Sequence, residues 1–255
     1  MVVAVVNNKG GVGKTTTSVN LGAALASPRR RVLLVDLDSQ ASASLWCGVP
    51  RPRLTPSSAD CLLHNYPVSK AIRTTSTPNF DLITGSIELA NADLALCDVR
   101  GRELTLRRVL QGIVSRYELI ILDCPPSLSL VGVNALVAAD AFLVPTTPQY
   151  LAMEGLVSLL AAVEQVRTRL NARARLLGIL LTSFDGSRAA NEACEQLRAQ
   201  YRERLFHTEI PTSRALEEAS AERLTIFEHA RRSRAADAFH RLAGEVLERL
   251  RHLKR

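Results

Sequence analysis

The sequence predicts an α/β protein with a mostly parallel sheet flanked by helices. Four short segments, at 31–36, 117–123, 140–145 and 176–182, are apolar without alternation, and each is followed by a segment with helical spacing. Continuous apolarity is typical of strands that are covered on both faces. Strands that alternate with helices imply right-handed crossovers and parallel pairing. A fifth apolar run, Val2–Val6, leads directly into a glycine-rich stretch.

Length and composition are those of a folded protein. The chain has 255 residues, of which 47% are hydrophobic and 22% charged, so it can bury a full core. We find no internal repeat and no low-complexity segment, and we therefore expect a single domain over residues 1–255. The net charge is +7 and the isoelectric point is about 9.5. This excess of positive charge favours a polyanionic partner such as nucleic acid.

Cysteine usage and the N-terminus indicate a cytoplasmic protein. The five cysteines form no C-x-x-C pair, so neither a zinc site nor a disulfide framework is indicated. No basic-then-apolar signal sequence follows Met1, and no apolar run approaches the ~20 residues needed to span a bilayer. We expect a soluble, cytoplasmic protein without a transmembrane segment.

The other elements are expected in a regular order along the chain. Helical spacing runs from Thr16 to Ala26, and residues 51–78 form an irregular excursion from the sheet. Further elements are predicted as short helices near 59–64 and 68–72, a strand at 80–84, helices at 89–96, 154–170 and 188–203, a strand at 205–210 and a final helix at about 232–250.

The stretch Asn8–Thr16 reads Asn-Lys-Gly-Gly-Val-Gly-Lys-Thr-Thr and is typical of a phosphate-binding loop. An ordinary glycine-rich turn would not need the Gly-Lys-Thr ending or the strand before and helix after it. In such a loop, backbone N–H groups and a helix N-terminus surround a phosphate. Lys14 would reach the β- and γ-phosphates, and the Thr15 hydroxyl would ligate Mg²⁺. The expected nucleotide-binding residues here are Lys9, Gly10, Gly11, Val12, Gly13, Lys14, Thr15 and Thr16.

The loop departs from the usual pattern because Asn8 replaces a glycine and a second lysine, Lys9, follows it. The form Lys-Gly-Gly-x-Gly-Lys-Thr resembles the deviant Walker A loop of the ParA/MinD family of ATPases, and most closely its ParA/Soj-type DNA-partition members. The resemblance implies a P-loop NTPase fold in which Lys9 reaches the nucleotide of a second subunit and acts in catalysis with Lys14. Two ammonium groups this close would repel each other unless a polyanion lay between them.

Three aspartates at predicted strand ends extend the resemblance. Asp123 begins an Asp-x-Pro-Pro segment, which in the family adjoins Mg²⁺ and senses the γ-phosphate. Asp36 and Asp38 match the family's Asp-x-Asp pattern, which implies a place near the metal for Asp36 and positioning of the attacking water for Asp38. Ser39 replaces the family's usual proline, so this loop is expected to be more mobile. The alternatives are a helix cap for Asp123 and two solvated loop acids.

The resemblance also reaches two later turns. The segment 145–155 resembles a proline-rich turn that leads, in the family, to a helix at the dimer face. Leu181-Thr-Ser-Phe and Ile210-Pro-Thr-Ser match the positions that surround the adenine base, which makes Thr182 and Pro211 expected base-pocket residues.

Arginines in the last third of the chain are the candidate DNA contacts, because the planar guanidinium donates two hydrogen bonds to a phosphate. In partition members of the family, arginines of these regions bind DNA non-specifically. Ser187 and Ala215 stand where the commonest pattern has arginine, one residue away from Arg188 and Arg214. The candidates are Arg188, Arg198, Arg202 and Arg214, with 198 and 202 expected on one helix face. A solvated basic helix face is the alternative for each of them.

The whole resemblance implies a partition ATPase with ATP and Mg²⁺ as cofactors. It implies a homodimer in the ATP state, non-specific binding to double-stranded DNA and an association with the nucleoid. It also implies weak intrinsic hydrolysis that a ParB-like centromere-binding protein stimulates, in chromosome or plasmid partition. Aromatic residues make up only 4% of the chain, so base stacking on single strands is poorly supported.

Two other functions remain open from the sequence. A MinD-like ATPase that cycles on membranes would use the basic, amphipathic segment 245–255 as an anchor, but this segment has no Phe or Trp and contains two glutamates. A nitrogenase-reductase-like electron carrier would need cluster cysteines, for which Cys97 and Cys124 are the only plausible pair.

Overall fold

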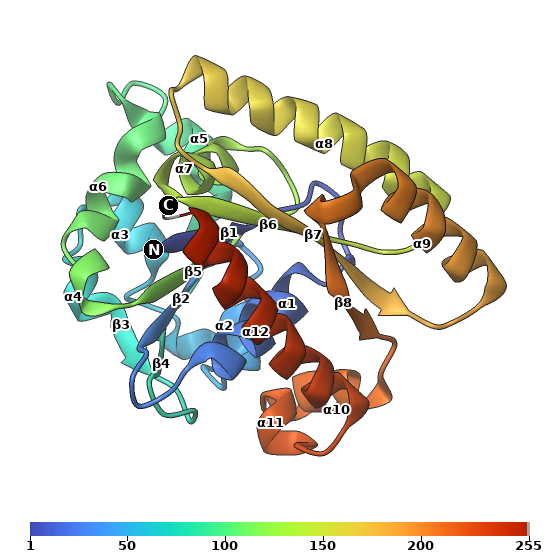
Figure 1. Ribbon diagram of the computed structural model, residues 1–255. Helices are drawn as coiled ribbons and strands as arrows, with labels where there is room; N and C mark the ends of the chain where they lie inside the picture. Colours follow the sequence, from blue (N-terminus) through green and yellow to red (C-terminus); the bar gives the residue numbers. More distant parts are fainter. Residues whose placement is uncertain (254–255) are drawn as a thin grey trace.

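The computed structural model describes residues 1–253, apart from the side chains of 150–154. Within this part the chain forms one eight-stranded sheet in the order β3-β4-β2-β5-β1-β6-β7-β8 (Figure 1). The strands are β1 (Val2–Val5), β2 (Val32–Asp36), β3 (Ile72–Thr74), β4 (Phe80–Ile83), β5 (Leu119–Asp123), β6 (Ala141–Thr146), β7 (Arg175–Phe184) and β8 (Leu205–Pro211). Every strand pair is parallel except β3 with β4. The predicted fold class, a mostly parallel sheet flanked by helices, is confirmed.

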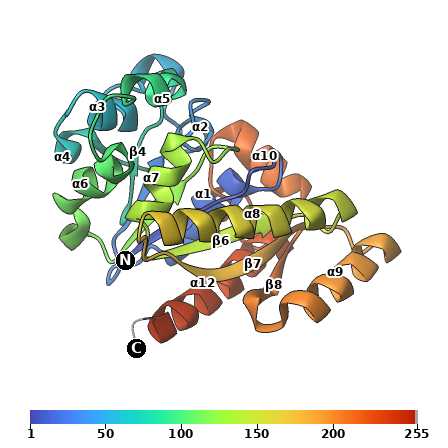
Figure 2. The same ribbon diagram turned by 90° about the horizontal axis from the view of Figure 1, so that it is seen from above.

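Helices cover both faces of the sheet (Figure 2). One face carries α1 (Lys14–Leu25), α2 (Ser42–Trp46), α10 (Arg214–Glu222), α11 (Ile226–His229) and α12 (Arg234–Leu253). The other carries α3 (Ser58–Leu63), α5 (Ala92–Ala95), α6 (Thr105–Gln111), α7 (Leu130–Ala138), α8 (Tyr150–Arg169) and α9 (Arg188–Tyr201). The short α4 (Val68–Ala71) precedes the edge strand β3. Parallel pairing requires such crossover connections between strands.

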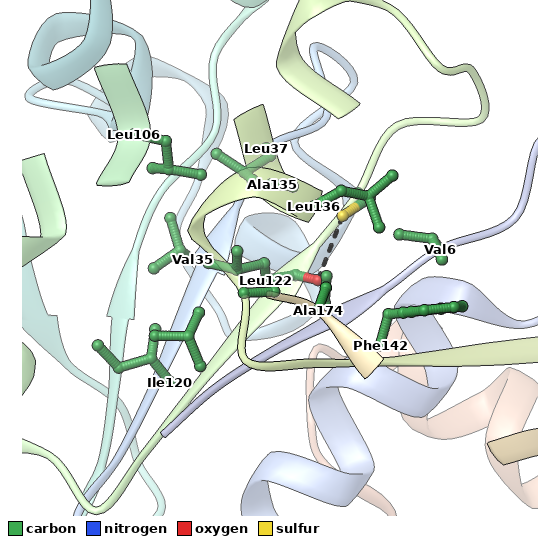
Figure 3. Packing of buried hydrophobic residues seen from close by; sticks show 14 of the residues in the cluster. Val6, Val35, Leu37, Leu106, Ile120, Leu122, Ala135, Leu136, Phe142 and Ala174 are labelled. Atoms are coloured by element: carbon green, nitrogen blue, oxygen red, sulfur yellow. Dashed lines mark hydrogen bonds between the residues drawn. The ribbon is translucent and has the colours of Figure 1, made fainter. Parts of the chain in front are cut away.

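The central strand supplies both cores, which is why its apolar run is continuous. Ala4 and Val6 belong to the cluster under α7 and α8, while Val3 and Val5 belong to the cluster under α1 and α12. Figure 3 shows part of the first cluster, to which Leu136 of α7 and Leu122 of β5 both belong. Side chains on alternate faces of a strand point to opposite layers. An apolar residue is therefore needed at every position.

Some predicted elements differ from the observed ones. The helix expected at 89–96 is a 3₁₀ turn, Ile87–Asn91, followed by the four-residue α5. The helix expected at 188–203 ends at Tyr201, because Arg202 adopts a φ of 45° and redirects the chain towards β8. The expectation that Arg198 and Arg202 share one helix face is therefore wrong. The helices α6, α10 and α11 were not predicted as separate elements.

The two longest helices are not membrane spans. α8 and α12 each have 20 residues, but both carry several charged side chains. Across residues 1–253 no helix has the combined length and apolarity that crossing a bilayer requires.

Close packing of α1 on the sheet depends on Gly22. A Cβ atom at this position would lie 2.5 Å from Cε2 of Phe80, whose side chain is fully buried. We predict that Gly22→Ala lowers the free energy of unfolding by about 1–3 kcal/mol, the usual range for overpacking a core. Urea unfolding would measure the change.

The matched control for this prediction is Gly244→Ala in α12. No atom lies within 4 Å of a Cβ built at Gly244. In an open helical site, alanine should instead stabilise by about 0.5–1 kcal/mol. Equal effects of the two substitutions would contradict the close contact at Gly22.

Candidate nucleotide-binding site

Three central strands end together at one edge of the sheet. Asp123 of β5 is in register with Val5 of β1 and with Asp36 of β2. The glycine-rich loop begins directly after β1, so its residues lie beside both carboxylates. Functional residues of parallel sheets gather at this carboxyl edge. The structure thus brings together the loop, Asp36 and Asp123, which are far apart in the sequence.

The glycine-rich loop has an open inner surface. Gly11 and Gly13 adopt φ values of 73° and 81°, which other residues rarely tolerate. A Cβ atom at Gly10 or Gly11 would meet no atom within 4 Å. Gly13 is the N-cap residue of α1 and, among the described residues, no side chain caps this helix. The first N–H groups of α1 therefore remain available to an anion.

The two lysines of the loop have different surroundings. Lys14 is buried, and its Nζ donates to the carbonyl oxygen of Lys9 at 2.9 Å. Burial lowers the pKa of Lys14, and the negative charges of Asp123 and Asp38 act in the opposite direction. Lys9 is half-buried, and its Nζ lies 3.3 Å from Oε1 of Gln149, just before α8. Among the described side chains, the Lys9 ammonium therefore has one contact, which is weak and neutral.

Asp123 connects β5 to the first turn of α1. Its Oδ2 accepts a hydrogen bond from the Thr15 hydroxyl at 2.9 Å, and its Oδ1 accepts one from the Ser18 hydroxyl at 2.7 Å. The carboxyl is fully buried, and burial raises its pKa, with a further contribution from the charge of Asp36. Sequence reasoning missed Ser18. Its position three residues after Thr15, on the same helix face, was the available signal.

Asp36 holds the segment that follows it. One carboxylate oxygen accepts hydrogen bonds from the backbone N–H and the hydroxyl of Ser44, at 2.9 and 2.6 Å. The other accepts from the N–H of Asp38 at 3.1 Å. Burial raises the pKa of Asp36, and these donors lower it in part. The Ser44 hydroxyl also accepts from the N–H of Gly85 at 2.9 Å, so Asp36 organises two loops at the site.

Asp38 is held less tightly than Asp36. Its side chain is half-buried, and its Oδ1 accepts a hydrogen bond from the N–H of Gln40 at 3.0 Å. Among the described residues, its Oδ2 has no hydrogen-bond partner. One oxygen thus fixes the side chain in its turn, and the other is free to accept a hydrogen bond from a water molecule.

A pocket of about 420 Å³ opens beside the loop. Its walls include Gly13, Thr16, Thr182 and Pro211, and also Trp46, which sequence reasoning did not single out. The Thr182 hydroxyl lies 2.9 Å from the Val12 carbonyl oxygen and 3.1 Å from that of Thr146. Thr182 therefore supports the back of the loop as well as lining the pocket.

The four candidate arginines do not form one surface element. Arg188 begins α9 and is paired with Glu192 at 2.8 Å, and Arg214 begins α10 and is paired with Glu218 at 2.8 Å. Arg198 is paired with Glu209 of β8. Arg202 is exposed, without an ion pair among the described residues. The side chains of Arg188 and Arg214 are 94% and 89% exposed, and ion pairs this exposed contribute little to stability.

The two cysteines considered for a metal cluster lie in different surroundings. Cys124 is buried and its Sγ donates to the Leu122 carbonyl oxygen at 3.6 Å, the dashed line in Figure 3. Cys97 is exposed after α5. Among the described residues, no group of three or more His, Cys, Asp or Glu side chains is placed to hold a metal ion.

Comparison with known proteins places these features in a family. A family model described as an AAA domain matches residues 1–176. The chromosome-partitioning ATPase Soj of Thermus thermophilus is 43% identical over 254 residues, which cover 97% of this chain and 96% of that protein. The sporulation initiation inhibitor protein Soj of Bacillus subtilis is 39% identical over 246 residues, which cover 96% and 97%. The chain belongs to the ParA/MinD family of ATPases. The predicted resemblance is therefore confirmed.

A solved structure supports the same assignment of the fold. Cobyrinic acid a,c-diamide synthase from Mycobacterium smegmatis, with a bound ATP analogue and magnesium, has a TM-score of 0.86 and 31% identity. The similarity covers 98% of this chain and 95% of that one. The P-loop ATPase fold thus extends over nearly the whole chain of this ParA/MinD family member.

Ser44 should be important for the stability of the site. We predict that Ser44→Ala lowers the free energy of unfolding by about 1–3 kcal/mol, because a buried carboxylate loses a hydrogen-bond donor. Denaturant titration of the ligand-free protein would measure this. Ser42→Ala on the same helix is the control, since Ser42 is exposed and should change stability by less than about 0.5 kcal/mol. Equal losses would show that the Asp36 contact is not what matters.

Proposed function

We propose that this protein is a partition ATPase that dimerises with ATP, binds duplex DNA non-specifically and releases it on hydrolysis. The observation that carries the proposal is the hydrogen bond between Thr15 and Asp123, beside the open loop and the 420 Å³ pocket. The relatives named Soj, one of them a chromosome-partitioning ATPase, support the role in partition. Chromosome or plasmid segregation, a nucleoid location and stimulation by a ParB-like partner belong to the same proposal.

In this proposal the loop binds the phosphates of ATP. The backbone N–H groups of residues 10–16 and the Lys14 ammonium surround the phosphates. Thr182 and Pro211, which line the adjoining pocket, contact the adenine base. The Thr15 hydroxyl and the carboxylates of Asp36 and Asp123 lie beside the loop, and oxygen ligands of this kind suit Mg²⁺. Thr15 would ligate the metal, and Asp123 would orient the Thr15 hydroxyl through their hydrogen bond. When bound, Mg²⁺ neutralises charge that develops on the phosphate oxygens.

The other two aspartates act on the water and on the geometry of the site. Asp38, with its free Oδ2, orients the attacking water and accepts its proton. Both oxygens of Asp36 are engaged by Ser44 and by the Asp38 backbone. Asp36 therefore contributes near the metal mainly by holding the Asp38 loop in place.

Lys9 is the residue that would link two subunits, by contacting the nucleotide of the second one. Its contact to Gln149 is long and neutral, so the ammonium can exchange it for a phosphate of a second subunit at little cost. A charge-assisted hydrogen bond to phosphate is roughly twice as strong as a neutral one. The ATP of one subunit would then be held by lysines from both.

Partition is favoured over the membrane-cycling alternative by the packing of α12. Val246 and Leu250 are buried in the core under this helix, and Leu247 and Leu253 pack against the same cluster. The apolar face that an anchor would insert into lipid is thus already covered by the protein. Residues 254 and 255, the end of the proposed anchor, lie outside the described residues.

Substitution of the two loop lysines should separate binding from dimerisation. We expect Lys9→Ala to bind ADP with Mg²⁺ normally but to stay monomeric with ATP, because only the second subunit's nucleotide loses a ligand. Lys14→Ala should lose about 100-fold or more in hydrolysis rate, since its charge contacts the reacting phosphates. Light scattering after gel filtration and a phosphate-release assay would test both.

Lys70→Ala is the control for the loop lysines, because Lys70 is exposed on α4. Undiminished hydrolysis by Lys14→Ala would refute the phosphate-loop assignment. An ATP-dependent dimer of Lys9→Ala would refute the role of Lys9 in the second subunit.

The DNA-binding candidates can be tested together. We predict that Arg202→Glu with Arg214→Glu weakens ATP-dependent binding to a random-sequence duplex at least tenfold at low salt. Phosphate contacts of this kind dominate non-specific affinity. Fluorescence anisotropy would measure the change, and affinity equal to that of the wild-type protein would remove these residues from the DNA surface.

A further inference from the structure

A second groove adjoins the nucleotide pocket. It has a volume of about 560 Å³ and lies between α2, the 3₁₀ turn Arg51–Arg53 and the end of α10. α2 and α10 lie side by side in this region (Figure 2). Arg51, in the 3₁₀ turn, and Arg223, at the end of α10, both line the groove. Trp46 and Ser220 line both this groove and the nucleotide pocket. The two cavities therefore share a wall.

The charge of the groove is entirely positive. Two arginines and the hydroxyls of Ser42 and Ser220 are among its lining residues, and none of these residues is acidic. Arg51 and Arg223 are exposed and have no ion pair among the described residues. Two nearby acids of α10 are engaged elsewhere, since Glu218 pairs with Arg214 and Glu222 pairs with His229. An anion in the groove would thus meet cations that no internal carboxylate neutralises.

The shared wall is tied to the nucleotide site from two sides. The indole Nε1 of Trp46 donates to the carbonyl oxygen of Leu224 at 2.7 Å, directly after Arg223. The N–H of Ile226 donates to Oδ1 of Asn20, on α1, at 2.8 Å. Trp46 lies two residues after Ser44, which is hydrogen-bonded to Asp36. Both α1 and α2 are thus hydrogen-bonded to residues that flank or adjoin the turn that carries Arg223.

We propose that this groove binds the phosphate backbone of duplex DNA, with Arg51 and Arg223 as the contacts and Trp46 as the link to the nucleotide pocket. The proposal rests on the proposed function and names a surface for its DNA partner that the arginine-rich C-terminal pattern alone does not indicate. Guanidinium groups and hydroxyl donors that line one groove suit phosphate oxygens, which accept hydrogen bonds from both. A backbone contact carries no sequence information, as non-specific binding requires.

The test compares two charge-matched double variants in anisotropy titrations with a fluorescent random-sequence duplex. Arg51→Glu with Arg223→Glu alters the groove, and Arg173→Glu with Arg175→Glu alters exposed arginines at the start of β7, at the opposite edge of the sheet. Both change the net charge equally, so long-range attraction falls equally. With ATP and Mg²⁺, we expect the groove variant to bind at least tenfold more weakly than the control. Its log affinity against log salt should have a slope shallower by about 2.

Trp46 supplies a second readout, because it is the only tryptophan in the chain. We expect ADP with Mg²⁺ to change its fluorescence in the wild-type protein and in both variants, which also shows that the groove variant is folded. Duplex DNA added to the ATP-loaded protein should change the emission of the wild-type and control proteins but not of the groove variant.

The outcomes separate this proposal from the proposed function. DNA affinity of the groove variant equal to that of the control would overturn the groove as a DNA surface. A Trp46 emission that ADP does not change would overturn the link to the nucleotide pocket. Failure of the wild-type protein and the control to bind DNA at any salt concentration would instead refute the proposed DNA-binding function itself.

Discussion

The fold and the site both depend on how the buried carboxylates at the centre of the sheet are satisfied. Asp36 and Asp123 lie in register on neighbouring strands, and both are fully buried. Burial of a charge is costly unless hydrogen bonds compensate for it. The hydroxyls of Thr15, Ser18 and Ser44 provide these bonds. The helices α1 and α2 are thereby attached to the sheet through groups that a nucleotide and its metal would also engage.

The two buried carboxylates also bear on how a metal ion would affect the site. Burial raises the pKa of both carboxyl groups, and the charge of Asp36 raises that of Asp123 further. A divalent cation would offset their repulsion. In the proposed function, the metal ion that accompanies the nucleotide would therefore offset an unfavourable interaction between these carboxylates. The helices fastened to these carboxylates are the elements expected to respond.

Hydrogen bonds connect these buried carboxylates to the surface. α2 carries Ser44 at one end of this network and Trp46 at the other, and Trp46 is hydrogen-bonded to the turn between α10 and α11. The same turn is held to α1 through Asn20. The two helices nearest to the phosphate loop thus share one attachment point on the C-terminal part of the chain. An equilibrium between nucleotide states could bias the position of this turn.

Much of the fold was predictable because it depends on local pattern. Continuous apolar runs indicate strands covered on both faces, and the turn residues after β1, β2 and β5 carry the motif chemistry. The helix at 89–96 was predicted too long, because short apolar spacing does not distinguish an α-helix from the 3₁₀ turn that precedes α5. The end of α9 was also misplaced, since the positive φ of Arg202 has no sequence signal comparable to glycine.

The sequence by itself determined the phosphate loop, the aspartates at the strand ends and the family, because these depend on residue type at close spacing. Only the tertiary structure decided which groups surround them. Ser18, Ser44 and Trp46 become part of the site because parallel register and helix packing bring distant segments to one edge. These hydrogen bonds and pocket contacts depend on distances between residues in the folded chain, and these distances cannot be read from residue types and spacing in the sequence.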